Sequence, residues 1–255
     1  MPFQKITSER LAAAVVRQIE HLILQGVLRA GDRLPPEREL SERLGVSRPS
    51  LREAVAELQA QGLLETRAGA GIFVSDVLGH AVSPALTRLF ARHEDALLDY
   101  ISFRQDMEGI AAARAARQGS DTDLALIAAI FRRMEAAHEG PDAAEEARLD
   151  AEFHMAIVEA SHNVVMLHMM RSMIDLLREG VFYNRAVMFR QHTTRAALLD
   201  QHRAINTAIQ MRDPDAAREA VADHLAFVRA ALRDQREADA HEIVARLRLA
   251  QETVR

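Results

Sequence analysis

The spacing of prolines and glycines in one segment, GDRLPPERELSERLGVSRPSLREAVAELQAQGLLETRAGAGIFV, constrains the fold of this chain more than any other feature. The Pro35-Pro36 pair predicts a helix over Glu37–Leu44, because proline is accommodated in the first turn of a helix. Gly45 predicts the end of this helix, and Ser47 is placed to cap a second helix from about Arg48 to Gln61. Two short helices joined by a tight glycine turn are typical of a helix-turn-helix.

The flanking segments complete a small domain. A helix is expected from about Ser8 to Gln25, with Leu11, Val15 and Ile19 on its apolar stripe. After the second short helix, the apolar stretches around Leu64 and Phe73 enclose Gly69 and Gly71, which predicts a β-hairpin with a glycine-rich tip. We therefore expect a winged helix-turn-helix over residues 1–76, followed by a linker over residues 77–94.

The remainder of the chain reads as helix after helix. Aromatic residues make up 4% of the sequence, while Ala, Leu, Arg and Glu dominate, which favours helices over a large sheet. Apolar stripes at helical spacing and short polar breaks predict an antiparallel bundle of six or seven helices over residues 95–240. The fold class is thus mainly α, with a small β wing. Residues 241–255 form a C-terminal tail whose order the sequence leaves open.

The predicted helix-turn-helix carries a candidate DNA-reading surface. Residues 1–76 contain ten basic and ten acidic side chains, so a DNA-binding face depends on their placement, which favours specific groove reading over bulk electrostatics. The second helix is the one that enters the major groove, and arginine suits bidentate contact with guanine. The candidate DNA-binding residues are Arg38, Ser47, Arg48, Ser50, Arg52, Arg67 and Gly69. The alternative is that Arg48 and Arg52 are solvated helix residues, with Arg52 paired to Glu53 or Glu57.

A second group of residues predicts a metal site in the helical bundle. Asp150 and His154 are four residues apart and project from one helical face, while His202 and His224 lie on separate amphipathic helices. Three imidazoles and a carboxylate suit zinc, the expected ion, and also manganese, nickel or iron. Because the chain contains eleven histidines and a lone helical histidine is commonly structural, the alternative is that these are ordinary core or surface residues.

Arg104 interrupts a largely apolar stripe, and a buried guanidinium needs an anion beside it. That anion is either an effector carboxylate or Glu108, one helical turn away. Asn206, one turn beyond His202, and Tyr183 are weaker candidates for effector contact.

The segment quoted above, within residues 8–76, closely resembles the DNA-binding domain of GntR-superfamily regulators. The resemblance places Arg38, Ser47, Arg48, Ser50, Arg52 and Gly69 at positions that contact operator DNA. Ala68 stands where some members carry a basic wing-tip side chain. Residues 97–235 are similar to the FCD ligand-binding domain of the FadR-type subfamily, whose metal-binding members carry an Asp-x-x-x-His pair and two later histidines. The resemblance implies a metal at Asp150, His154, His202 and His224, and an effector carboxylate at Arg104.

Within that family, EASHNVVMLHMMRSMIDLL looks most like regulators that respond to lactate, pyruvate or glycolate. We therefore expect a cytoplasmic, non-membrane, homodimeric repressor that reads palindromic half-sites and responds to a small 2-hydroxy or 2-oxo acid, and that is not an enzyme. Two alternatives stay open: a regulator for which the metal itself is the signal, and a metal-dependent enzyme fused to a DNA-binding head.

Overall fold

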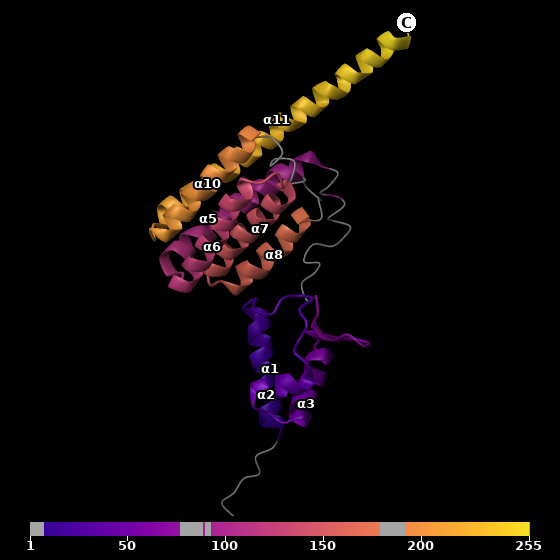
Figure 1. Cartoon of the computed structure of the whole chain (residues 1–255), viewed down its shortest axis with the longest axis vertical. Coiled ribbons are helices and arrows are strands. Elements are labelled where there is room, and N and C mark those ends of the chain that lie inside the picture. Colours follow the sequence, from indigo (N-terminus) through magenta and orange to yellow (C-terminus); the bar gives the residue numbers. More distant parts are fainter. Residues whose placement is uncertain (1–7, 77–88, 90–92, 179–191, 255) are drawn as a thin grey trace, which may run out of the picture. The chain divides into compact units, whose positions relative to one another are not determined.

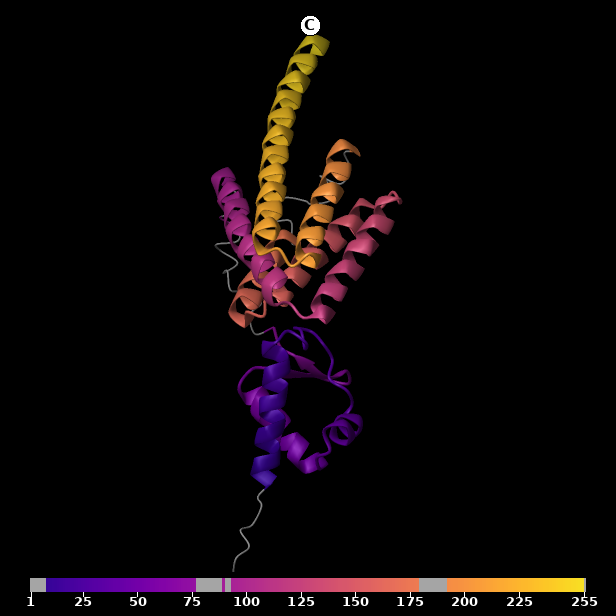
Figure 2. The ribbon, with the colours of Figure 1, turned by 90° about the vertical axis from the view of Figure 1, so that its left-hand side faces the viewer.

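The structure is a computed structural model that describes residues 8–76, 89, 93–178 and 192–254. The chain divides between Ala81 and Val82 into two compact units, which are considered separately below. Figures 1 and 2 show that both units are built chiefly from helices, and that the sheet found among the described residues is a small hairpin in the N-terminal unit. The mainly α fold class expected from the sequence is confirmed.

The N-terminal unit contains three helices and a hairpin: α1 (Ser8–Leu24), α2 (Glu37–Leu44), α3 (Arg48–Ala60), β1 (Leu64–Arg67) and β2 (Gly71–Val74). Helix α2 has Pro36 as its N-cap and ends at Gly45, whose φ of 65° is left-handed and favours glycine. Helix α3 begins where the Ser47 hydroxyl accepts a hydrogen bond from the Ser50 amide at 3.3 Å. The predicted helix-turn-helix is therefore present, with its predicted caps.

The two strands are antiparallel, with Leu64 opposite Val74. Arg33 adds an isolated bridge to Phe73, which the sequence did not predict.

The apolar core of this unit joins α1 and α3 to the hairpin through buried side chains that include Val15, Ile19, Leu51, Leu58, Leu64 and Val74. The expectation that Leu11 belongs to the buried stripe of α1 is wrong, since Leu11 is 47% exposed. Ala12 and Val16 take up the buried side of the first turns instead.

In the C-terminal unit, six helices lie within the described residues: α5 (Glu94–Gln118), α6 (Asp121–His138), α7 (Ala143–Ala160), α8 (Val164–Arg178), α10 (His192–Gln210) and α11 (Pro214–Val254). Short polar side chains cap the N-termini of several of these helices. Ser120 and Asp123 form a capping box on α6, and Asp142 caps α7. Helix α8 begins at Val164, where the Asn163 side chain accepts a hydrogen bond from the Met166 amide.

These helices pack around one interior. Helix α11 contacts α5 and α10 most extensively, and α7 packs against α5 and α6. The core between them contains fully or almost fully buried apolar side chains, among them Ile101, Phe153, Ile157, Ile205 and Leu225. As a result, α5, α7, α10 and α11 all present side chains to the same interior, where the polar group described below is found.

Helix α11 continues through residues 241–254, the segment whose order the sequence left open. In both views its yellow end runs past the other helices of the C-terminal unit (Figures 1 and 2). After Pro214 this segment contains neither glycine nor proline to break the helix. No helix among the described residues is long and apolar enough to cross a membrane.

Candidate metal centre and DNA-reading surface

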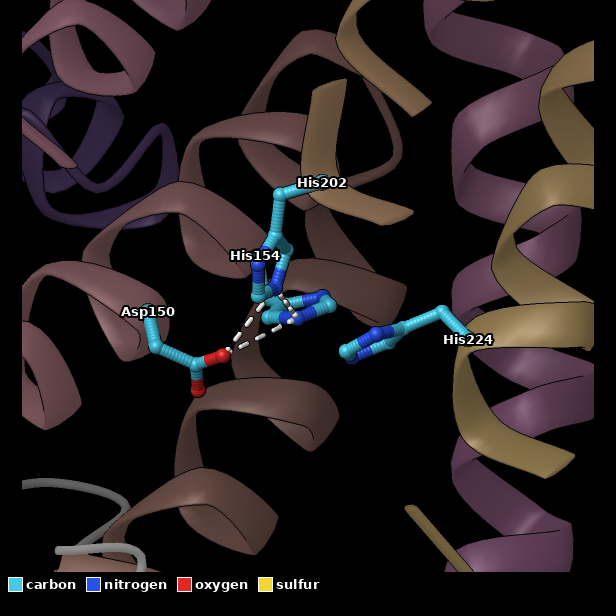
Figure 3. A group of neighbouring side chains, drawn as sticks. All are labelled: Asp150, His154, His202 and His224. Atoms are coloured by element: carbon cyan, nitrogen blue, oxygen red, sulfur yellow. Dashed lines mark hydrogen bonds and ion pairs between the residues drawn. The ribbon is translucent and has the colours of Figure 1, made fainter. Parts of the chain in front are cut away.

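Four polar side chains meet in the interior of the helical unit. Helix α7 supplies Asp150 and His154, α10 supplies His202 and α11 supplies His224. They are 5%, 1%, 0% and 2% exposed, respectively. Figure 3 shows the imidazoles of His154 and His202 between the Asp150 carboxylate on one side and His224 on the other. The structure thus brings together all four residues that the sequence selected as metal ligands.

The distances between the donor atoms fit a metal ion. One donor atom from each residue lies within 4.8 Å of the others. His202 Nε2 is 3.1 Å from Asp150 Oδ1 and 3.3 Å from His154 Nε2, and His154 Nε2 is 3.7 Å from Asp150 Oδ1. Donor atoms about 2.1 Å from a common ion are separated by roughly 3.0 to 3.4 Å in octahedral or tetrahedral geometry. Two of the three distances match that range, so the group could hold a divalent ion once the donors that lie farther apart move closer together.

Neighbouring side chains orient two of the imidazoles. Glu108 on α5 has Oε2 2.7 Å from His154 Nδ1, and Gln201 has Oε1 3.1 Å from His224 Nδ1. A carboxylate on the Nδ1 side favours a proton there and leaves the Nε2 lone pair for the ligand group. The Phe153 ring packs edge-on against His202, with centroids 5.4 Å apart. This is the arrangement that typically supports metal-binding histidines.

Sequence reasoning missed these roles of Glu108 and Gln201. The sequence suggests Glu108 only as a partner for Arg104 and suggests no role for Gln201. The available signal was that Glu108 is itself a charged residue on the apolar stripe of α5, which also carries Ile101 and Ala111.

The Arg104 guanidinium is paired within its own helix. Its Nε lies 2.6 Å from Glu108 Oε1 and its Nη2 lies 3.2 Å from Glu108 Oε2, with both side chains almost fully buried. The internal pair, one of the two alternatives left open by the sequence, is therefore present. Burial disfavours the charged form of Glu108, but Arg104 and His154 outweigh it and hold the pKa of Glu108 well below its usual range. Contact between Arg104 and an effector stays a prediction.

Burial lowers the pKa of His224, whereas burial by itself raises that of a carboxyl group such as Glu108. Desolvation, reinforced by the neighbouring His202 and His154, holds the pKa of His224 well below its usual range. The neutral imidazole, which is the form that binds a metal, is therefore favoured.

The two weaker candidates for effector contact are Asn206 and Tyr183, and the structure adds no support for either. Asn206 is half-buried and accepts a hydrogen bond from Gln210, whose amide also donates to the Leu124 carbonyl on α6. Tyr183 lies outside the described residues.

The candidate DNA-binding residues lie at the start of α3, on α2 and on the wing. Ser47 and Arg48 are exposed, whereas Ser50 is 2% exposed, with its hydroxyl 2.9 Å from that of Ser47. Arg52 pairs with Glu37 of α2 at 2.9 Å rather than with Glu53 or Glu57. This pairing lowers the pKa of Glu37. The recognition helix is thus tied to the helix that precedes it.

The remaining candidates are also exposed. Arg38 lies 3.8 Å from Glu42 on the same helix. On the wing, Arg67 is 2.7 Å from Glu65 and stacks over the Phe73 ring at 4.3 Å from its centroid. Gly69 occupies the hairpin tip with a φ of 71°, a conformation that favours glycine. The contact of each residue with DNA stays a prediction.

Comparison with known proteins matches both units. The model of the family of bacterial regulatory proteins called gntR matches residues 11–74, and the FCD domain model matches residues 99–227. The "Glc operon transcriptional activator" of Escherichia coli K12 is 33% identical over 237 residues, covering 92% of this chain and 93% of that protein. The "Putative L-lactate dehydrogenase operon regulatory protein" of the same strain is 38% identical over 228 residues, covering 88% and 86%.

Among solved structures, "Streptococcus agalactiae GntR" matches with a TM-score of 0.50 and 28% identity, covering 88% of this chain and all of that one. These relatives are regulators, so the alternative of a metal-dependent enzyme is not supported. The winged helix-turn-helix, the helical unit and the matches to both domains lead to one conclusion: the chain belongs to the GntR family of bacterial DNA-binding transcription regulators and carries an FCD domain.

Proposed function

We propose that this regulator senses a small 2-hydroxy or 2-oxo monocarboxylic acid, of the lactate, glycolate or pyruvate type, through a divalent ion held by Asp150, His154, His202 and His224. The observation that carries the proposal is the buried group itself, with one carboxylate oxygen and three imidazole nitrogens within 4.8 Å of one another. Burying so many polar groups is costly unless something binds them. Three nitrogens and an oxygen suit zinc, which is the proposed ion.

The class of acid follows from the chemistry of such an ion. When bound, the ion supplies a Lewis acid with coordination positions beyond the four protein donors, and a 2-hydroxy or 2-oxo acid offers two adjacent oxygens to it. Glu108 contacts both Arg104 and His154 and so links Arg104 to the metal-ligand group. The Arg104 guanidinium supplies the positive charge that binds the acid's carboxylate. The relative named for an L-lactate dehydrogenase operon supports an acid of this kind.

The DNA side of the proposal uses the exposed residues at the start of α3. Arg48 and Arg52 read base edges in the major groove, Arg38 contacts the phosphate backbone and the wing approaches the adjacent minor groove. Two copies related by a two-fold axis read two palindromic half-sites. The acid changes helix packing around α7, α10 and α11 and thereby lowers operator affinity, so that the protein acts as a repressor released by its inducer.

A thermal-shift matrix of metal-replete and metal-free protein against L-lactate, glycolate and pyruvate tests this function. A ligand that binds only the native state raises the melting temperature. We expect at least one acid to do so, only with metal bound, and neither Arg104→Ala nor His202→Ala to respond. The absence of any acid response in metal-replete protein would refute the proposed effector class.

A second candidate function, in which the metal is the signal, is favoured by one observation. The four donors come from the chain alone and equal in number the protein ligands that zinc takes in closed sites. Operator affinity that changes with zinc and ignores every acid in the matrix would favour this alternative.

A further inference from the structure

The charges buried around the candidate metal centre have a definite balance. Among the described residues, the buried acidic and basic side chains of the helical unit are Arg104, Glu108, Glu146 and Asp150. Glu146 is offset by Arg195, whose Nε lies 2.6 Å away. Within the part of the chain that the structure describes, the centre thus contains one arginine, two carboxylates and three imidazoles. With neutral imidazoles, the metal-free group has one excess negative charge, and a divalent ion turns this into one excess positive charge.

Glu108 decides this balance because it contacts both halves of the centre. One of its oxygens is 2.6 Å from Arg104 Nε, and the other is 3.2 Å from Arg104 Nη2 and 2.7 Å from His154 Nδ1. Its side chain is 2% exposed, so water does little to screen the charge. It thus offsets the charge of Arg104 and also holds a proposed metal ligand, His154.

We propose that Glu108 sets the charge of the effector, so that the metal-loaded centre accepts singly charged acids and rejects doubly charged ones. This inference rests on the proposed function and deepens it. A monocarboxylate neutralises the loaded centre, whereas a dicarboxylate leaves an excess negative charge in a buried site, which is costly. In the metal-free protein the centre is already negative and repels both.

L-Lactate and tartronate form a matched pair of probes. Both are 2-hydroxy acids, and tartronate carries a second carboxylate in place of the methyl group of lactate. At pH 7.5 the first is a monoanion and the second a dianion. A difference between them in binding therefore reports chiefly on charge.

The test is calorimetric titration of zinc-loaded, full-length protein with both acids, for the natural chain, Glu108→Gln and Glu108→Asp. Glutamine removes the charge but keeps an oxygen that can accept the His154 Nδ1 proton. We expect the natural chain to prefer lactate, Glu108→Gln to shift the ratio of the two dissociation constants towards tartronate by about tenfold or more, and Glu108→Asp to keep the natural preference. Glu146→Gln is the control, since it removes another buried, arginine-paired carboxylate that has no contact with His154 among those described.

A second readout separates charge selection from a purely structural role. Zinc affinity, measured by competition with a chelator in the absence of any acid, should fall by about 10- to 100-fold in Glu108→Gln, because the buried negative charge beside His154 is lost even though the amide oxygen still accepts its Nδ1 proton. Natural protein that binds tartronate as tightly as lactate overturns the inference, whether or not the variants fold. An unchanged ratio in Glu108→Gln also overturns it. If neither acid binds any zinc-loaded protein, the proposed effector class fails instead.

Discussion

Loss of one donor should abolish most of the stabilisation that a metal gives to this protein. His202 is the informative choice, because it is fully buried and its Nε2 lies 3.1 and 3.3 Å from two of the other donors. At a free zinc concentration 100 times the dissociation constant, binding to the native state alone adds about 2.7 kcal/mol to the free energy of unfolding. For a unit of this size, that corresponds to a rise of about 5 to 11 °C in melting temperature.

The magnitude for His202→Ala follows from the same relation. If removal of one of four ligands weakens binding about 100-fold, the same free zinc concentration only half-saturates the variant and adds about 0.4 kcal/mol. The expected rise is then about 1 °C. Each variant is compared with its own metal-free form, so that any change in packing caused by the substitution cancels.

The assay is differential scanning calorimetry in a zinc buffer, with full-length protein. His241→Ala is the matched control, because His241 is an exposed histidine on α11 and should leave the zinc-dependent rise intact. An equal rise in His202→Ala and in the natural chain would refute the assignment of His202 as a ligand. No rise in the natural chain would refute the metal centre as a whole.

Three further predictions address the cap, the recognition helix and the buried histidine. Ser47→Ala should lower the unfolding free energy of the N-terminal unit by about 1 kcal/mol in urea denaturation, since the Ser50 amide loses its capping acceptor; an unchanged midpoint would contradict this. Arg48→Ala should weaken operator binding by about 1 to 3 kcal/mol and relax the base preference at one position of each half-site, whereas Arg246→Ala on α11 should do neither; an unchanged affinity and base preference in Arg48→Ala would contradict this. In metal-free protein, His224 has a lowered pKa, so its contribution to stability is present above about pH 6.5 and is lost as pH falls towards its folded pKa. His224→Gln should flatten this pH dependence of the unfolding free energy; an identical pH profile would argue against the assignment.

Local signals explain why the N-terminal unit could be predicted closely. The bounds of α2 follow from Pro36 and Gly45, and the start of α3 follows from Ser47, because each of these residues acts on the backbone next to it. The bridge between Arg33 and Phe73 was missed because nothing near Arg33 in the sequence specifies a partner 40 residues away. The exposure of Leu11 was missed because adjacent apolar positions on α1 compete for the same core.

The candidate metal centre likewise combines residues that the sequence predicted with contacts that it did not predict. The spacing of Asp150 and His154 on one helix predicted their convergence. His202 and His224 were predicted as ligands because they lie on separate amphipathic helices, and the resemblance to a family supported the full set of four. The contact of Glu108 with His154 joins α5 to α7, and the contact of Gln201 with His224 joins α10 to α11. Such contacts depend on how the helices pack, which no local pattern in the sequence specifies. The partner of Arg52 was likewise found on another helix, at Glu37.

Coupling between the acid, the metal and DNA is the central claim, and fluorescence anisotropy of labelled operator DNA tests it most directly. Operator fragments selected from a random-sequence pool by the metal-loaded protein are titrated with that protein, with and without L-lactate, glycolate or pyruvate. We predict that at least one acid weakens operator binding by tenfold or more with zinc present and has no effect on metal-free protein or on His202→Ala. Operator affinity that is unchanged by every acid in the presence of zinc would contradict it.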